Sequence, residues 1–441
     1  MWDFLFHHTP LLYLTQSAWR DEAFSILLAM RSPLYFIPKL AFEPPLYYLL
    51  LHFWMKLFGT SEIAARALSL VGFALANVVV IIWAERLFKK HWLSWFLPVF
   101  FFFNPQLLYY AFEIRAYGWY MFFAVTSMFA YWEKRRALYV VSTTLGLYTH
   151  TYMIIVPAVQ VIHYLLIHHK TLFTKANFWF DRQIRVFALT AILIAPWITK
   201  VIIDFPRLQE SWYFPIDEQS IKSVLGNIFV GYEGTPADLW KFTAWLSVLF
   251  VAIALTALMW AKKKRARNGF FFLMVFVPVA TILGISWYKP LFVNRYVMPS
   301  TIAQVFLIVF AIELIRHKTI QKIAAIVALV FVLGFNLWYP SRHPKKDMRS
   351  TIYEVQGLMG PHDVILTDSP LILFETLYYS RDPSRVFWYN PEGIPFPWYI
   401  GDIAFSPSRV ARELPPYPIR AFVIHRDTLF EVAYSTALKA K

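Results

Sequence analysis

Long apolar stretches separated by short polar connections dominate the hydrophobic pattern of this chain. A helix needs about 20 apolar residues to cross about 30 Å of hydrocarbon, and successive stretches from residue 66 onward approach or exceed that length. They run at about 66–87, 92–111, 116–132, 137–150, 152–169, 185–203, 239–261, 269–288, 296–315 and 319–339. We therefore predict a polytopic α-helical membrane protein with about 10 transmembrane helices. Stretch 137–150 is the shortest and must borrow residues from its flanks.

Polar interruptions ahead of these stretches predict helices that lie at the membrane surface. Seven Leu, Ile or Phe residues in segment 11–30 favour insertion by roughly 2–4 kcal/mol. Arg20, Asp21 and Glu22 oppose it, because each charge near a helix centre costs about 2.5–3.5 kcal/mol. The cost of inserting these charges exceeds the gain from the apolar residues, so this segment lies on or outside the membrane. Segment 46–58 is apolar but short, which is typical of an interfacial helix.

Basic residues fall in alternate connections, and this pattern orients the array. The basic connections are Arg86 to Lys90, Lys134 to Arg136, Lys170 to Arg185, Lys262 to Arg265 and Arg316 to Lys322. The intervening connections, 112–115, 150–151, 204–238 and 289–295, are mixed or acidic. Positively charged loops stay in the cytoplasm, so we expect residues 1–65 and the chain beyond 340 to lie outside.

Composition agrees with this class of protein and excludes others. Hydrophobic residues make up 58% of the 441, and charged residues only 16%, against about 25% in a soluble domain. The basic connections explain much of the formal net charge of +15, so the predicted partner is the lipid bilayer and no nucleic acid is expected. The chain has no cysteine, which excludes disulfides and thiolate metal sites.

The two ends of the chain differ from the apolar array. An external N-terminal segment has no obvious route across the membrane, so we expect that a first helix is missing from this reading frame or that residues 1–14 are its remnant. From residue 341 the sequence becomes Pro-rich and mixed in charge. Buried strands are predicted at 364–366 and 421–424, and helices near 347–358 and 407–413. The expected domains are thus 1–340 in and on the membrane, with 1–65 external, and an extracytoplasmic α/β domain at 341–441.

Residues able to carry chemistry gather in the predicted outer connections. They are Arg20, Asp21, Glu22, Glu43, Glu113, Arg115, Tyr117, His150, Lys289, Arg295 and Tyr296. A carboxylate near a low-dielectric interface is able to take a proton from a hydroxyl, and an arginine binds phosphate bidentately. Each residue also has an ordinary interpretation as a surface charge, a helix-start acid, a loop ion pair, a polar turn or a cation that snorkels to lipid. One external site is the best joint explanation of the set.

Four stretches and a late Arg295-Tyr296 pair resemble a known family. The stretches are Trp19-Arg20-Asp21-Glu22-Ala23-Phe24, Glu43-Pro44-Pro45-Leu46-Tyr47-Tyr48 continuing through Phe58-Gly59-Thr60-Ser61-Glu62 to Arg66, Glu113-Ile114-Arg115-Ala116-Tyr117, and Leu147-Tyr148-Thr149-His150. They resemble GT-C glycosyltransferases that use polyprenyl-phosphate sugars. The similarity is to the bacterial membrane branch related to protein O-mannosyltransferases and the lipid A aminoarabinose transferase, and it spans roughly residues 15–340.

This resemblance implies a GT-C-like fold and an inverting sugar transfer from a polyprenyl-phosphate donor to an extracytoplasmic acceptor, which is a protein, a glycolipid or a wall glycan. Asp21 would be the general base, assisted by Glu22. The donor phosphate would be held by residues Glu43, Arg115, Lys289, Arg295 and Tyr296, with Arg20, Glu113, Tyr117 and His150 in support. The implied location is the bacterial cytoplasmic membrane, with the site on its outer face.

Two departures from the family pattern bear on the site. Glu43 stands where many relatives have a histidine before the proline pair, so its role stays open. No cofactor is predicted. The metal site of the aminoarabinose branch is not supported, because 204–238 and 288–295 lack a histidine; a divalent cation is left as an alternative.

Two rival functions remain at this stage. A lipid-linked sugar carrier or flippase would need helices broken at the midplane and charges within the membrane, whereas the charges here gather at one surface. The other rival is an envelope-binding module on an inactive anchor.

Overall fold

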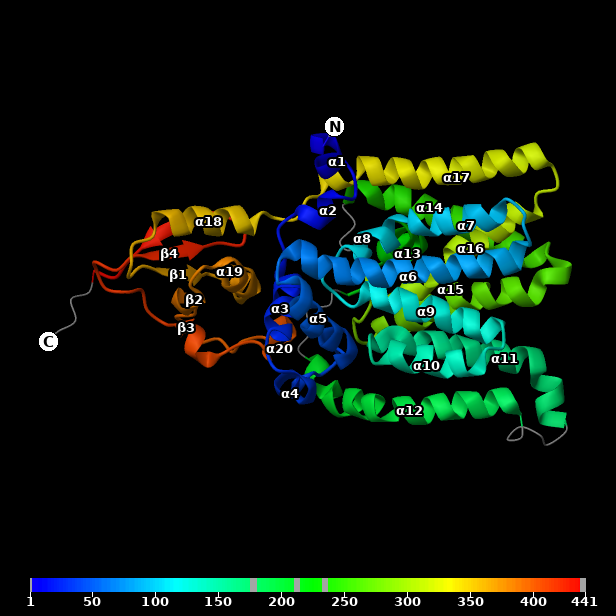
Figure 1. The fold of residues 1–441 in the computed structure, drawn as a ribbon, viewed down its shortest axis with the longest axis horizontal. Helices are drawn as coiled ribbons and strands as arrows, with labels where there is room; N and C mark the ends of the chain where they lie inside the picture. The colour runs from blue at the N-terminus through cyan, green and yellow to red at the C-terminus, as the bar shows by residue number, and fades with distance from the viewer. Residues whose placement is uncertain (1, 175–180, 210–214, 232–236, 437–441) are drawn as a thin grey trace.

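A bundle of long helices lies beside a small α/β domain in the computed structural model (Figure 1). The structure describes residues 2–174, 181–209, 215–231 and 237–436. Helices of the bundle run side by side, and the C-terminal domain sits beyond one end of them. Short N-terminal helices lie between the bundle and this domain, so residues far apart in the sequence meet there (Figure 1).

Within the described residues, seven helices are long and apolar enough to cross a membrane. They are α6 (Glu62–Phe88), α11 (Ile155–Thr174), α12 (Arg182–Asp204), α14 (Trp240–Met259), α15 (Arg265–Ser286), α16 (Met298–Leu314) and α17 (Lys318–Trp338). Three further predicted spans form shorter helices. Stretch 92–111 is divided into α7 (Leu93–Phe102) and α8 (Pro105–Ala111), while α9 (Tyr117–Trp132) and α10 (Arg136–Leu147) have 16 and 12 residues. The predicted count of about 10 therefore includes helices below the usual length.

The break between α7 and α8 follows from two local features. Pro105 cannot continue a helix from the preceding turn, and the side chain of Asn104 instead accepts the backbone N–H of Leu107 to cap a new helix. The predicted outer connection 204–238 also contains a helix, α13 (Glu218–Val230), that packs on α14.

Two glycines allow α6 and α9 to cross closely. A Cβ atom on Gly118 would lie 1.9 Å from the carbonyl oxygen of Ser69, and one on Gly72 would lie 2.7 Å from the backbone of Gly118. At this crossing the hydroxyl of Ser69 donates to the carbonyl of Arg115 at 2.9 Å. The close packing therefore fixes the backbone that carries Arg115.

The N-terminal helices cover the domain-side end of the bundle. They are α1 (Trp2–His8), α2 (Leu12–Thr15), α3 (Arg20–Ala29), α4 (Pro33–Phe36) and α5 (Pro45–Phe58). None of these described helices reaches the length of a span, in agreement with the surface location predicted for 11–30 and 46–58. The side chain of Glu22 accepts the backbone N–H of Trp19 at 3.3 Å and so helps to start α3.

The C-terminal domain is a five-stranded sheet in the order β3-β2-β1-β4-β5. Its strands are β1 (Val364–Thr367), β2 (Val386–Tyr389), β3 (Val410–Ala411), β4 (Ala421–Ile424) and β5 (Phe430–Ala433), and its helices are α18 (Met348–Leu358), α19 (Leu373–Tyr379) and α20 (Trp398–Gly401). All neighbouring pairs are parallel except β4 with β5. The structure confirms both predicted strands and the first predicted helix. The helix predicted at 407–413 is wrong, because the chain makes one 3-10 turn at 407–409 and then pairs with β2.

Candidate functional site

A cavity of about 120 Å³ lies where the N-terminal helices, the end of the bundle and the C-terminal domain meet. Sequence-predicted residues line it from four separate parts of the chain: Arg20, Asp21, Glu43, Arg115, Arg295 and Tyr296. Segment 398–403, which contains α20, supplies the wall on the domain side. The predicted outer connections and the C-terminal domain are therefore at the same end of the bundle.

A second cavity of about 70 Å³ adjoins the first. Glu43, Arg115 and Tyr296 line both cavities, and Tyr117 and His150 line only the second. The two spaces thus share one wall. Below, the first is called the acid–arginine cavity and the second the tyrosine–histidine cavity.

Asp21 lies in the first turn of α3 and faces a group of cations. Its Oδ1 accepts the Nε–H of Arg20 at 2.8 Å, and its Oδ2 lies 3.9 Å from Nη2 of Arg295. Burial alone would raise the pKa of Asp21, but Arg20, Arg115 and Arg295 outweigh burial and lower the pKa to about 2. The carboxylate is therefore ionised in the empty cavity and accepts hydrogen bonds only.

Glu43 holds the side chain of Arg115 in the wall between the cavities. The Nη2 of Arg115 donates to Oε1 of Glu43, and the hydroxyl of Tyr48 donates to the other oxygen of this carboxylate. The other terminal nitrogen, Nη1 of Arg115, donates to the hydroxyl of Ser25 at 3.3 Å and to that of Tyr48 at 3.4 Å. Glu43 is thus an anchor for a cation of the cavity wall.

Arg295 is the second deeply placed cation, with only 3% of its side chain exposed. It begins in the short turn ahead of α16 and reaches across the site toward α3. Its guanidinium lies 5.9 Å from the ring centroid of Trp19 and 5.5 Å from that of Tyr296. Aromatic faces stabilise a cation that burial has partly removed from water.

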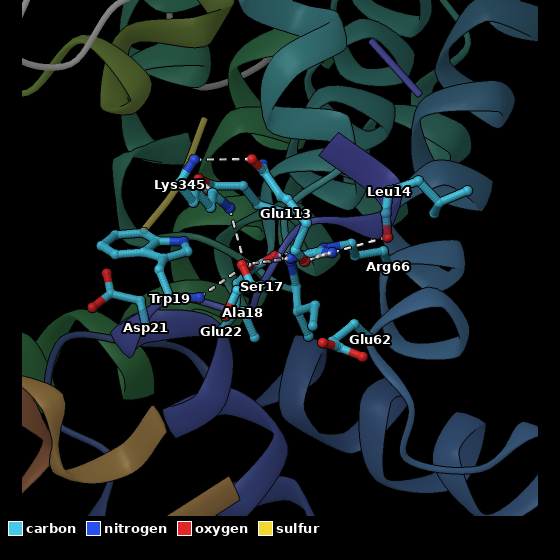
Figure 2. A network of polar contacts seen from close by, with 12 residues as sticks. Leu14, Ser17, Ala18, Trp19, Asp21, Glu22, Glu62, Arg66, Glu113 and Lys345 are labelled. Atoms are coloured by element: carbon cyan, nitrogen blue, oxygen red, sulfur yellow. Dashed lines mark hydrogen bonds and ion pairs between the residues drawn. The ribbon is translucent and has the colours of Figure 1, made fainter. Parts of the chain in front are cut away.

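Glu22 points into a different environment from its neighbour Asp21 (Figure 2). Its carboxylate is fully buried and accepts two hydrogen bonds from Arg66, Nε–H at 3.0 Å and Nη2–H at 2.8 Å. The Nζ of Lys345 lies 3.0 Å from the same carboxylate and 3.7 Å from Oε1 of Glu113. Glu22, Arg66, Glu113 and Lys345 are called the buried ionic network from here on.

Opposite pKa shifts distinguish the two acids of this network. Burial raises the pKa of both groups, but at Glu22 the charges of Arg66 and Lys345 overcome it and lower the pKa. At Glu113 burial prevails and the pKa is raised. Neither acid lines either cavity, so the structure places both behind the site rather than in it. Lys289 likewise lines neither cavity.

His150 is held as a neutral ring at the domain-side end of α10. Burial, followed by the charges of Arg115 and Arg295, lowers the pKa of His150 to about 3. Its Nδ1 accepts the backbone N–H of Tyr152 at 3.3 Å, and its ring stacks on that of Tyr120 with 4.4 Å between the ring centroids.

Sequence reasoning did not assign the contribution of the C-terminal half to the site. Arg207 and Asp402 form an ion pair, and both line the acid–arginine cavity. Lys345 enters the buried ionic network from the segment between α17 and α18. Nothing in the local sequence distinguishes these residues from other surface charges. Arg66 had one usable signal, since it is a charge near the start of a long apolar stretch.

Glu375 brings a third carboxylate close to α3. It lies on α19, which packs on α3. Burial raises its pKa to about 8. Among the residues that the structure describes, no group of three or more His, Asp or Glu side chains is arranged to hold a metal ion.

Comparison with solved structures confirms the GT-C-like fold that was expected from the sequence. Two solved structures share it over 96% of this chain and 93% of theirs. ArnT from Cupriavidus metallidurans in the apo state has a TM-score of 0.62 at 13% identity, and the same protein bound to undecaprenyl phosphate has a TM-score of 0.58 at 14% identity. Identities this low establish likeness of fold. No protein-family model matches the sequence, and no curated protein matches it.

Proposed function

We propose that this chain is an integral membrane glycosyltransferase that moves a sugar from a polyprenyl-phosphate carrier to an acceptor at the outer face of a bacterial cytoplasmic membrane. The observation that carries the proposal is the convergence of Asp21, Arg115 and Arg295 on one cavity. A base and two cations are what a displacement at a sugar carbon with a phosphate leaving group requires. The likeness to ArnT bound to undecaprenyl phosphate supports a lipid-phosphate carrier.

In the proposed reaction Asp21 accepts the proton of an acceptor hydroxyl as that oxygen attacks the anomeric carbon. The bond between this carbon and the phosphate oxygen breaks, and its electron pair leaves with the lipid phosphate. Arg115 and Arg295 stabilise the negative charge that develops on the phosphate, and removing one such donor typically lowers kcat by about 10²–10³. Attack opposite the leaving group inverts the configuration of the sugar.

Glu22 has a positioning role in this proposal. It touches neither cavity, but its hydrogen bonds to Arg66 and to the backbone of Trp19 and Ile114 hold the first turn of α3. Asp21 belongs to that turn. The buried ionic network therefore sets the direction in which the base points.

The direct test is transfer by Asp21→Asn in proteoliposomes, with undecaprenyl-phosphate sugars extracted from native membranes as donors and membrane fractions as acceptors. We expect loss of transfer with binding of undecaprenyl phosphate that is at least as tight, because asparagine keeps the shape, lacks the negative charge beside the phosphate and cannot accept the proton. Asp204→Asn is the matched control, since Asp204 is also an acid near this end of the bundle but pairs with Lys200 and lines neither cavity. Native turnover by Asp21→Asn would reject the proposed base.

Orientation and the rival carrier function need separate measurements. A reporter inserted after residue 30 of the otherwise complete chain should report the outer face, and a cytoplasmic signal would reject the proposed location. A lipid-linked sugar carrier would move donor across reconstituted vesicles without an acceptor. We expect no such movement, because the described ionisable residues of the site gather at one end of the bundle.

A further inference from the structure

The two adjoining cavities differ in charge. The acid–arginine cavity is lined by Arg20, Asp21, Arg207, Arg295 and Asp402 in addition to the shared wall. Of the described residues that line the tyrosine–histidine cavity, the charged ones are Glu43 and Arg115, and these two are paired with each other. The rest of its polar lining consists of hydroxyl groups and the neutral His150 ring. One cavity is therefore ionic and the other is uncharged but polar.

Two polar groups of the tyrosine–histidine cavity are available to a ligand. Because Nδ1 of His150 accepts a backbone N–H, the proton of the neutral ring is on Nε2, which makes Nε2 a donor. In the part of the chain that the structure describes, neither this nitrogen nor the hydroxyl of Tyr117 has a hydrogen-bond partner. The His150 ring is held by its stacking on Tyr120. Both groups belong to residues that line this cavity.

The geometry of displacement assigns different parts of the substrate to the two cavities. In an in-line attack the incoming oxygen, the anomeric carbon and the leaving oxygen lie on one line, and the remainder of the sugar ring extends to the side of it. The base and the cations that serve this line are in the acid–arginine cavity. A ring extending sideways past Arg115 and Tyr296 enters the cavity on the other side of that wall.

We propose that the tyrosine–histidine cavity is the subsite for the sugar of the donor, that Tyr117 and His150 bind its hydroxyl groups, and that it selects an uncharged sugar. This inference rests on the proposed transfer function. A sugar hydroxyl donates to the Tyr117 oxygen or accepts from His150, so both groups are satisfied. An ammonium group would instead lie beside Arg115, with the nearest carboxylate, Glu43, already bound to Arg115 and Tyr48.

Binding measurements on the full chain in lipid nanodiscs test this assignment. The probes are undecaprenyl phosphate, a set of undecaprenyl-phosphate neutral hexoses and an undecaprenyl-phosphate 4-amino-pentose. We expect at least one neutral hexose donor to bind about tenfold or more tightly than the bare lipid phosphate, the gain from one or two hydrogen bonds. The amino-sugar donor should bind no better than the lipid phosphate itself.

Two variants test whether the tighter binding of the neutral donor depends on the tyrosine–histidine cavity. Tyr117→Phe and His150→Phe keep an aromatic ring at each position and remove its hydrogen-bonding group, so each should abolish most of the preference for the neutral donor and leave the affinity for undecaprenyl phosphate unchanged. His150→Gln retains an N–H donor and should keep part of the preference. Tyr139→Phe is the matched control, because Tyr139 is a buried tyrosine of α10 that lines neither cavity.

The outcomes separate this inference from the function on which it rests. Three outcomes would overturn the sugar subsite. The Tyr117 and His150 variants could lose affinity for the lipid phosphate and the neutral donor equally, or keep the preference unchanged. The third outcome is tight binding of the amino-sugar donor. In each of these cases, the Asp21→Asn assay decides separately whether transfer requires Asp21. A wild-type protein that binds no undecaprenyl phosphate overturns both.

Discussion

The ion pair between Glu22 and Arg66 allows a quantitative test of the buried ionic network. Both side chains are completely buried, and the shortest distance between their charged atoms is 2.8 Å. At an effective dielectric constant of about 20, two charges at this distance attract each other by about 6 kcal/mol before desolvation is subtracted. Removing one partner leaves the other charge buried, so we expect Arg66→Met and Glu22→Gln each to lower the free energy of unfolding by about 3–5 kcal/mol.

The double variant should cost no more than either single one. Counting Glu113 and Lys345 as ionised, each single variant leaves one unbalanced charge, whereas the double variant leaves this balanced pair. Its remaining cost is the loss of the hydrogen bonds that Arg66 donates to the carbonyls of Leu14 and Gln16, about 1–3 kcal/mol for the buried Gln16 acceptor and less for the partly buried Leu14 acceptor. The coupling energy of the cycle should therefore be about 3 kcal/mol or more.

Equilibrium unfolding in mixed detergent micelles, followed by tryptophan fluorescence, gives the four free energies of this cycle. Arg86 and Glu133 form the control cycle, because they are also an Arg–Glu pair, at 3.1 Å, but are partly exposed; its coupling should be below about 1 kcal/mol. If the effects of Arg66→Met and Glu22→Gln add to within about 0.5 kcal/mol, the two side chains do not form the coupled pair described here, and the positioning role of Glu22 is refuted.

Three further predictions concern pH and packing. Burial raises the pKa of Glu375 from 4.5 to about 8, so between these pH values the folded state keeps a proton that the unfolded state loses, and the free energy of unfolding should fall as pH rises. In Glu375→Gln the free energy of unfolding, measured from about pH 5 to 9, should depend less on pH. An unchanged slope would contradict this prediction. The pKa of about 2 at Asp21 predicts that kcat/KM, which reports the free enzyme, shows no acid limb from this group above about pH 5. An acid limb in the wild-type kcat/KM with a midpoint above about pH 5 would contradict that value. Gly118→Ala should destabilise the fold by about 1–3 kcal/mol, because its Cβ would clash with the Ser69 carbonyl. Gly284→Ala is the control and should not destabilise it, because there is open space around Gly284. Equal unfolding midpoints of the two variants would refute the close crossing of α6 and α9.

Loop charge was enough to predict that Asp21, Arg115 and Arg295 lie at the same end of the bundle. Asp21, Arg115 and Arg295 are far apart in the sequence, yet all three fall in segments on the side of the array that the basic connections avoid. The bundle geometry then leaves little freedom, because residues at the same ends of antiparallel helices are neighbours. The structure brings all three to one cavity.

The different environments of Asp21 and Glu22 were beyond sequence reasoning. Consecutive residues on a helix point about 100° apart, so one of the two carboxylates had to turn away from the cavity. Which one does so depends on Arg66 and Lys345, and Lys345 is more than three hundred positions along the chain from Glu22. A tertiary contact of this kind leaves no periodic or local signal in the sequence.

In the proposed transfer reaction, the cations that would bind the phosphate also lower the basicity of Asp21 before the donor binds. Arg20, Arg115 and Arg295 lower the pKa of Asp21, so the free carboxylate has little tendency to take a proton from water or from a hydroxyl. A lipid phosphate bound to Arg115 and Arg295 brings negative charge that offsets theirs, and the pKa of Asp21 then rises toward values suited to proton transfer. In the proposed mechanism, donor binding and activation of the base would thus be linked through the same guanidinium groups, and reaction would be favoured only when the leaving group is in place.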